Sequence, residues 1–202
     1  MDDRGATPGP TGVATTRRRP AALARIVRHK LLAHLDRRRT VFRWRDGAAT
    51  LPGPTIVPQR IAALAQVPES VFRDRDPGGM PREWYAHFFA QGAALWTAIE
   101  HGRALGSLWV VPAERLGAWY VPVEREALIV YGVVTPARER GRRVAGQLAL
   151  AAARDGDAAG RPVYLDCMVW NRPAHHAFEK AGFEPMAVVG TRWRAARMDR
   201  DV

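Results

Sequence analysis

The second half of the chain alternates between strand-like and helix-like hydrophobic patterns, and this alternation restricts the fold more than any other feature. The segments 126–135 and 162–170 are rich in Val, Ile and Tyr, which favours strands. The segments 142–154 and 172–181 have the composition and spacing of helices. Strands that alternate with helices predict a sheet with parallel neighbours and helices on its faces. We therefore expect an α/β fold with a mixed central β-sheet flanked by helices.

The remaining segments predict further strands and two short helices. Strands are predicted at 40–45, 94–100, 103–111 and, as one strand or two, 183–198. The first of these is followed by Asp46-Gly47, a pair typical of hairpin turns. Helices are predicted at 59–66 and at 81–91, the second with Pro81 at its start. The segment 112–125 predicts a loop with a short strand near 119–123.

The N-terminal segment carries most of the positive charge. Of the 202 residues, the first 45 hold 12 Arg or Lys and 3 Asp, whereas the rest hold 19 basic and 17 acidic residues. Residues 1–20 have almost nothing to bury and are predicted to be a disordered tail. Apolar residues then recur at helical spacing, so 21–39 predicts a basic amphipathic helix. We expect a single folded domain at 40–202, preceded by this basic extension.

Two absences in the sequence exclude several classes of protein. No apolar run approaches the roughly 20 residues that a membrane-spanning helix needs. Cys167 is the only cysteine, which excludes a disulfide framework and a cysteine-based zinc site within the chain. We expect no metal and a reducing, cytoplasmic environment, with Cys167 packed in a strand rather than acting as a nucleophile.

The segment 133–153 has the features of a phosphate-binding turn. A strand ends at Pro136, an Arg/Gly loop follows, and a helix begins in small residues. The first N–H groups of a helix have no partner within it and lie at the positive end of its dipole, which suits a phosphate. Gly141, Ala145 and Gly146 allow close approach to the backbone. The four loop arginines are unfavourable beside a helix N-terminus by about 0.3–1 kcal/mol each, which a bound polyanion would reverse; a solvated Arg run is the alternative.

The segment 171–183 predicts an amphipathic helix directly after a strand. Asn171, Ala174 and Phe178 share one helical face, which His175 also joins, whereas His176 points elsewhere. Asn171 is suited to the N-cap and Gly182 to the stop. Taken alone, this pattern is that of an ordinary surface helix.

Together, and about 30 residues apart, these two segments resemble the GNAT acyltransferase superfamily. R-G-R-R-V-A at 140–145 is similar to its acyl-CoA pyrophosphate loop, R/Q-x-x-G-x-G/A. N-x-x-A-x-x-A-F-E-K-A-G-F at 171–183 is similar to its N-x-x-A-x-x-L-Y-E-K-x-G-F segment. The resemblance is sharp over 126–186, architectural over 40–125 and absent from 1–39. It implies a GNAT-like sheet and transfer of an acyl group, acetyl above all, from acyl-CoA to a small-molecule or protein amine.

The resemblance also implies which residues bind acyl-CoA. The end of the strand would hold the thioester and pantetheine arm, the loop and helix start would hold the pyrophosphate, and the later helix would line the thiol side. The implied set is Val133, Val134, Arg138, Arg140, Gly141, Arg142, Arg143, Val144, Ala145, Gly146, Asn171, Ala174 and Phe178.

The chain departs from the family pattern at two positions. Arg143 stands where the loop usually has glycine, so its side chain must turn outward or contact a CoA phosphate. Phe178 stands where the family carries a tyrosine that protonates the leaving thiolate, and a phenyl ring cannot donate a proton. Another group or water must then act, or catalysis has been lost. His175 is our candidate acid because it lies three residues earlier on the same helical face.

Acyl transfer also needs a base for the attacking amine and donors for the developing oxyanion. Family members often carry a glutamate on the strand before the loop, so Glu126 is the candidate base, with Glu124 second and Tyr131 placed to position substrate. A solvated carboxylate is the alternative for Glu126. The sequence does not identify the acceptor, although the aromatic residues of 56–125 would suit an apolar or aromatic amine.

Two other functions remain open at this stage. A GNAT-like domain that binds acyl-CoA without catalysis would explain Phe178. A module that binds nucleic acid or an anionic membrane would use the basic residues 17–45.

Overall fold

The computed structural model describes residues 36–45, 49–51, 56–74, 81–117 and 119–190. The chain divides into two units between Leu35 and Asp36, and all described residues belong to the second. The predicted tail at 1–20 and most of the helix predicted at 21–39 lie outside the described residues, and its last residue, Arg39, begins a strand.

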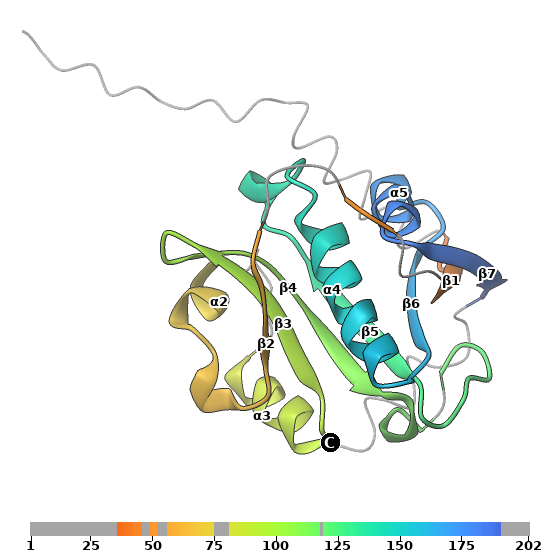
Figure 1. The fold of residues 1–202 in the computed structure, drawn as a ribbon, viewed down its shortest axis with the longest axis horizontal. Coiled ribbons are helices and arrows are strands. Elements are labelled where there is room, and N and C mark those ends of the chain that lie inside the picture. Colours follow the sequence, from red (N-terminus) through yellow and green to blue (C-terminus); the bar gives the residue numbers. More distant parts are fainter. Residues whose placement is uncertain (1–35, 46–48, 52–55, 75–80, 118, 191–202) are drawn as a thin grey trace, which may run out of the picture. The chain divides into compact units, whose positions relative to one another are not determined.

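The described residues form a seven-stranded mixed sheet (Figure 1). Its strands are β1 Arg39–Trp44, β2 Pro58–Ile61, β3 Ala94–Glu100, β4 Arg103–Pro112, β5 Leu128–Val134, β6 Val163–Met168 and β7 Phe183–Val189. They are ordered β2-β3-β4-β5-β6-β1-β7. Only the β5–β6 pair is parallel.

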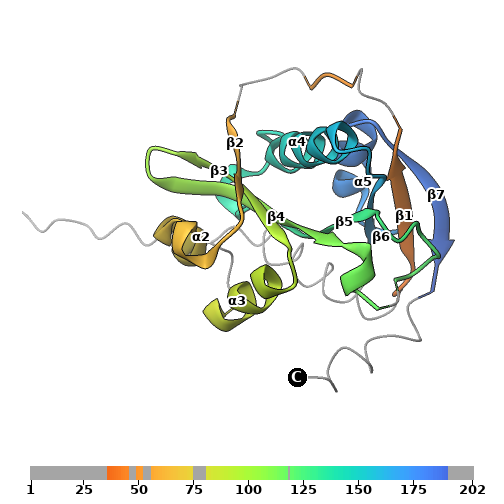
Figure 2. The ribbon, with the colours of Figure 1, turned by 60° about the horizontal axis from the view of Figure 1, so that its bottom comes forward.

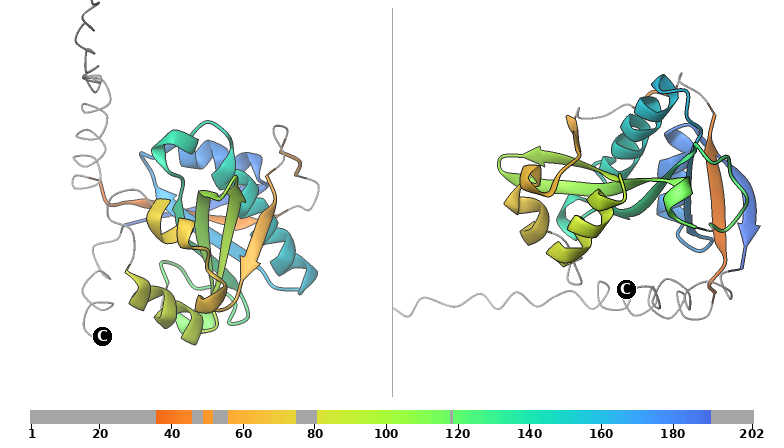
Figure 3. Two further views of the ribbon diagram at one scale, coloured as in Figure 1. Left: turned by 90° about the vertical axis from the view of Figure 1, so that its left-hand side faces the viewer. Right: turned by 90° about the horizontal axis from the view of Figure 1, so that it is seen from below.

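Helices cover both faces of the sheet. The α-helices are α2 Glu69–Asp74, α3 Arg82–Ala90, α4 Val144–Ala158 and α5 Arg172–Lys180, with 3-10 turns η1 Leu64–Gln66, η2 Ala113–Arg115 and η3 Ala137–Glu139. α4 packs on β3, β4 and β5 and against α5. α2 and α3 lie on the opposite side of β3 and β4 (Figure 2; Figure 3, right). None of the described helices has the length and apolar character that crossing a membrane requires.

Alternation along β4 divides the core between the two faces. Leu108 and Val110 join the cluster beneath α4 and α5, whereas Trp109 and Val111 join the cluster beneath α2 and α3. Successive side chains of a strand point to opposite faces, so a continuous apolar run is what a strand covered on both sides requires.

The predicted fold class is confirmed, with local corrections. The helix predicted at 59–66 is wrong: the edge strand β2 and the turn η1 occupy it, and β2 pairs with β3. The short helix α2 was not predicted. The strand predicted at 119–123 is absent from the described residues there. The turn residues 46–47 lie outside the description, but β1 pairs with β6 and β7 and not with β2.

The start of α4 rests directly on a glycine of β4. A Cβ added to Gly106 would lie 2.8 Å from Val144 Cγ1 and 2.9 Å from the Val134 carbonyl oxygen. Only glycine lets β4, the end of β5 and the first residue of α4 approach so closely, because the two obstacles are a buried side chain and backbone.

We therefore predict that Gly106→Ala lowers the free energy of unfolding by about 1–3 kcal/mol, the usual effect of overpacking a core. Gly190→Ala is the matched control, because a Cβ there meets nothing within 4 Å. Urea denaturation of both variants measures the difference. Equal stability of Gly106→Ala and wild type would show that β4 and α4 are not in such close contact.

Candidate functional site

β5 separates from its parallel neighbour halfway along its length. It pairs with β6 through Leu128, Ile129 and Val130 only. On its other side, a β-bulge lies between the Trp109–Tyr131 and Ser107–Val134 pairs of β4 and β5, and Gly132 there has a φ of +61°. A bulge turns a strand away from its neighbours. The predicted pair Val133 and Val134 therefore lies in a stretch whose side toward β6 has no strand partner among the described residues.

The backbone then turns into α4 through two left-handed residues. Gly141 has a φ of +88° and Arg143, the N-cap residue, has a φ of +63°. No side chain caps this helix, and its first backbone hydrogen bond runs from the Gln147 N–H to the Arg143 carbonyl. The N–H groups of Val144 and Ala145 are thus available to an external acceptor. Arg143 adopts the conformation that glycine usually supplies, at a steric cost of roughly 1–2 kcal/mol.

A buried carboxylate organises the arginines of this loop. Glu139 is 7% exposed, and Arg142 donates a hydrogen bond of 2.8 Å to it. Arg138 donates a second one of 3.3 Å. The same Arg142 also reaches Glu100, at the end of β3, with two contacts of 2.8 Å. The hydrogen bond from Arg142 holds the pKa of Glu139 below its usual range.

These ion pairs correct the expectation that the loop arginines repel the helix end without compensation. Glu139 and Glu100 face Arg142, and hydrogen bonds to Glu100 first and Glu139 second raise its pKa. The Arg142 side chain therefore ties the loop to the β3–β4 hairpin. Arg140 instead donates from Nε to the Thr135 carbonyl at 3.4 Å. The Oγ1 of Thr135 is buried and has no hydrogen-bond partner among the described residues.

Gly146 has a packing role that the sequence did not indicate. A Cβ at this position would lie 3.1 Å from the carbonyl oxygen of Ala177 in α5. The glycine therefore brings α4 and α5 together. Predicted site residues from three elements meet in one apolar cluster as a result: Val144 and Phe178 are buried in it, and Val133 and Ala174 pack against it.

Phe178 is part of the core. It is 2% exposed and makes edge-on contacts with Phe42 and Phe183, at ring-centroid distances of 6.2 and 6.4 Å. Asn171 stands at the N-cap of α5 as predicted, although its side chain makes no capping hydrogen bond.

His175 contacts the end of β6 and a ring of β1. Its Nε2 lies 3.2 Å from the Met168 carbonyl oxygen, and its ring packs edge-on against Phe42 at 5.2 Å. It lines a cavity between α5 and strands β1 and β7, together with His176, which the helical pattern had directed elsewhere. The contacts of His175 thus lie on the end of β6 and on β1.

Glu126 lies at the opposite end of β5 from the loop. It is exposed, two residues before the strand, and its carbonyl oxygen accepts a hydrogen bond of 2.6 Å from Arg161. At about 3.3 Å per residue, it is roughly 20 Å along the chain from Val133. Glu124 is engaged by the Tyr164 hydroxyl at 2.6 Å and by Arg43 at 3.1 Å. The geometry thus separates both carboxylates from the other predicted site residues.

Tyr131 and the residues around it form an aromatic face on the other side of β5. Tyr131 is 36% exposed and stacks on Phe88 of α3. Phe88 in turn stacks on Trp109, whose indole N–H is buried without a partner in the described part of the chain.

Sequence reasoning missed Gly106, Gly132, Glu100 and Glu139. The glycines carried a usable signal, because glycine inside a strand often marks a bulge or a close approach. Glu100 and Glu139 carried no such signal, since Glu100 and the Arg142 that joins them lie on elements far apart in the sequence. Cys167 is buried as expected, and burial raises its pKa to about 12. Within the described ranges, no three His, Cys, Asp or Glu side chains gather in a way that could hold a metal ion.

Solved structures share this fold. An acetyltransferase of the GNAT family from Novosphingobium aromaticivorans is 18% identical, with a TM-score of 0.54, over 75% of this chain and 61% of its own. One from Colwellia psychrerythraea is 15% identical, with a TM-score of 0.55, over 81% and 59%. The chain thus spans about three fifths of each. AAC(6')-Iy, solved with the bisubstrate analogue CoA-S-monomethyl-acetylneamine, is 20% identical, with a TM-score of 0.53, over 70% and 99%. At these identities the likeness shows the fold alone.

Sequence comparison assigns the family. No curated protein matches the chain. Residues 61–183, more than half of the chain, match the model of the acetyltransferase (GNAT) family. This range includes the bulged β5, the arginine loop, α4 and α5. The chain therefore belongs to the GNAT acetyltransferase family.

Proposed function

We propose that this protein is an acyl-CoA-dependent N-acyltransferase, with acetyl as the acyl group and a small-molecule or protein amine as the acceptor. The observation that carries the proposal is the uncapped N-terminus of α4, which the loop 135–143 connects to the end of β5 that has left β6. Members of the GNAT family are N-acetyltransferases, and AAC(6')-Iy shares the fold in complex with a CoA-containing analogue.

The residues present fit such a co-substrate. The N–H groups at the start of α4 suit a pyrophosphate. The free edge of β5 at Val133 and Val134 suits the amide groups of a pantetheine arm, as an added strand would. The unpartnered Thr135 hydroxyl, buried at the end of β5, is a polar atom for which the described residues offer no partner.

Different groups of the chain would then bind the co-substrate and stabilise the reaction. Arg140, Arg143 and the α4 backbone bind phosphate oxygens, and the β5 backbone N–H groups stabilise the developing oxyanion. When bound, acyl-CoA supplies the thioester carbonyl that the amine attacks. The acceptor would approach over Tyr131, and we propose that its proton passes to solvent, because Glu126 and Glu124 lie at the far end of β5.

The direct test is isothermal titration calorimetry with acetyl-CoA, followed by turnover on a panel of aliphatic, aromatic and aminoglycoside amines. Binding with turnover supports the proposal. Binding without turnover on any amine favours the acyl-CoA-binding, non-catalytic alternative, which the phenyl ring at 178 motivates. No binding at millimolar acetyl-CoA contradicts both.

The direction in which a substitution of Glu139 changes CoA affinity distinguishes charge repulsion from positioning of the loop. Removing a negative charge beside a phosphate site should tighten CoA binding by simple Coulomb attraction. If Glu139 instead holds the loop in its binding shape, Glu139→Gln weakens CoA binding, and we expect a Kd about tenfold higher, the loss of one charge-assisted hydrogen bond. Glu114→Gln, which removes the same charge from η2, is the control. A tighter Kd for Glu139→Gln would contradict the positioning role.

The same variant has a defined pH signature. Arg142 lowers the pKa of Glu139 in the folded protein, so the ionised Glu139 stabilises the fold. This stabilisation is complete above the ordinary glutamate pKa of about 4.3 and is lost as the pH falls below it. The difference in Tm between wild type and Glu139→Gln should therefore be constant above about pH 5 and shrink below about pH 4. Thermal denaturation from pH 3 to 8 measures it.

Arg143 should trade stability for binding. Arg143→Gly removes a side chain from a left-handed position and should raise the free energy of unfolding by about 1 kcal/mol. It also removes a cation from the proposed phosphate site, so we expect CoA affinity to fall several-fold. Arg143→Asn tolerates the same backbone and should lose affinity equally. Unchanged CoA affinity in both variants would show that the Arg143 side chain turns outward instead.

The phenyl ring at 178 predicts the shape of the pH profile. The acceptor must be deprotonated, so kcat should rise with pH, and without a tyrosine acid it should reach a plateau rather than fall at alkaline pH. Steady-state kinetics at saturating acetyl-CoA measure this. A descending limb that disappears in His175→Ala would restore the acid role of His175.

A further inference from the structure

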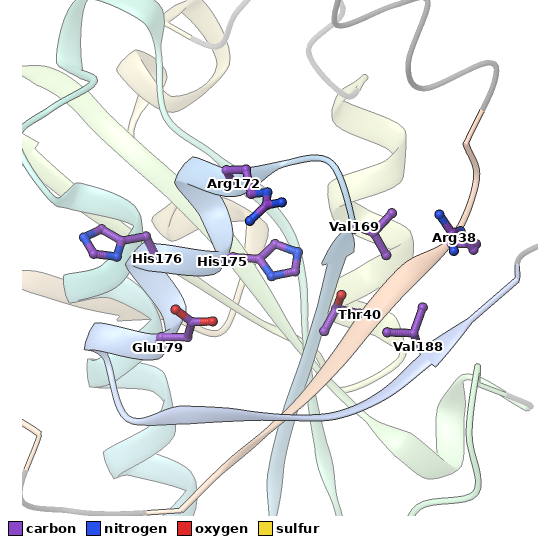
Figure 4. A pocket seen from close by; sticks show the side chains of 8 residues that line it. All are labelled: Arg38, Thr40, Val169, Arg172, His175, His176, Glu179 and Val188. Atoms are coloured by element: carbon purple, nitrogen blue, oxygen red, sulfur yellow. The ribbon is translucent and has the colours of Figure 1, made fainter.

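The outer face of α5 forms one wall of a cavity of about 590 Å³ that the proposed reaction does not use (Figure 4). The helix contributes Arg172, His175, His176 and Glu179 to this wall. Thr40 of β1 forms part of the opposite side. The remaining lining comes from Arg38 and two valines at the ends of β6 and β7.

This cavity is separate from the proposed acyl-CoA site. The Ala177 carbonyl of α5 faces Gly146 of α4, whereas His175 packs on Phe42 of β1. α5 therefore stands between the two regions. β1 and the end of β7 also lie outside residues 61–183, which match the family model. The cavity is built partly from segments that the match does not include.

Opposite charges lie at separate places along its helical wall. Arg172 and Glu179 are seven residues apart, which is about two turns or roughly 10 Å along a helix. Figure 4 draws His175 between them. Neither side chain forms an ion pair with another described residue. The other cation of the cavity, Arg38, is paired with Asp36 at 2.9 Å.

The ring of His175 is held in place within this wall. A carbonyl oxygen only accepts hydrogen bonds, so the contact with Met168 requires Nε2 to carry a proton. Packing against Phe42 fixes the ring from a second direction. Between the two charged side chains, the cavity thus has a fixed surface, with the apolar Val169 and Val188 opposite.

We propose that this cavity binds a small zwitterion with a carboxylate at one end, an aliphatic middle and an amine at the other. Arg172 pairs with the carboxylate through its guanidinium fork, and Glu179 accepts the ammonium group. The Thr40 hydroxyl and the valines contact the middle. A ligand with only a negative charge would be repelled by Glu179. A ligand with only a positive charge would be repelled by Arg172.

The test compares three probes of one length on the full chain: 6-aminohexanoate, hexanoate and hexylamine, by calorimetry. The zwitterion should bind in the millimolar range, more tightly than either singly charged probe. Arg172→Gln should weaken 6-aminohexanoate about tenfold, the effect of one charge-assisted hydrogen bond, and remove its advantage over hexylamine. Glu179→Gln should weaken it similarly and remove its advantage over hexanoate.

Lys180→Gln is the matched control, because it removes a charge from the same helix outside the cavity lining. All three side chains are exposed, so folding should persist, and melting curves verify it. No binding of 6-aminohexanoate at tens of millimolar would overturn the proposal. The proposal would also be overturned if Arg172→Gln and Glu179→Gln left the binding unchanged while Arg143→Gly abolished it. That result would place the probe at the loop before α4.

Discussion

The separation of β5 from β6 after Val130 is the constraint on which the rest of the site depends. Backbone N–H and C=O groups must find partners, and a strand that leaves its neighbour inside a sheet gives up such partners. Here the bulge at Gly132 turns the strand, while Val133 remains packed on the core beneath α4 and α5. The packed side chain of Val133 holds this segment in place, although its backbone no longer pairs with β6. A ligand with amide groups can replace the lost strand partner.

A second constraint is electrostatic. The loop before α4 concentrates arginines beside the positive end of a helix dipole, and this arrangement would be strained without acids. Glu139 is nearly buried and Glu100 reaches the loop from the β3–β4 hairpin, so Arg142 serves as the bridge. Arg140 donates to the Thr135 carbonyl at 3.4 Å, and Arg143 occupies the N-cap of α4. Two carboxylates thus offset the charge of Arg142, and its side chain shapes the loop before α4.

Local patterns predicted much of this fold, whereas contacts between distant segments were beyond them. The Ala- and Leu-rich α4 and the amphipathic α5 were predictable because 3.6-residue periodicity is local. The edge strand β2 was mistaken for a helix because only its pairing with β3 decides its conformation. The insertion of β1 between β6 and β7 also depends on partners more than 100 residues away. The strand pattern predicted that Glu126 lies next to β5. It did not show that Glu126 and the loop are at opposite ends of this strand.

The position of β1 also offers a physical account of the phenylalanine at 178. β1 brings Phe42 into contact with both His175 and Phe178, and Phe183 also contacts the Phe178 ring. A hydroxyl within these three rings would need a hydrogen-bond partner, since an unpaired buried one costs about 1–3 kcal/mol. Phenylalanine avoids that cost. The strand that completes the sheet thus favours a residue without an acidic proton, and it also holds His175 on the cavity side of α5. One packing arrangement accounts for both the missing acid and the second cavity.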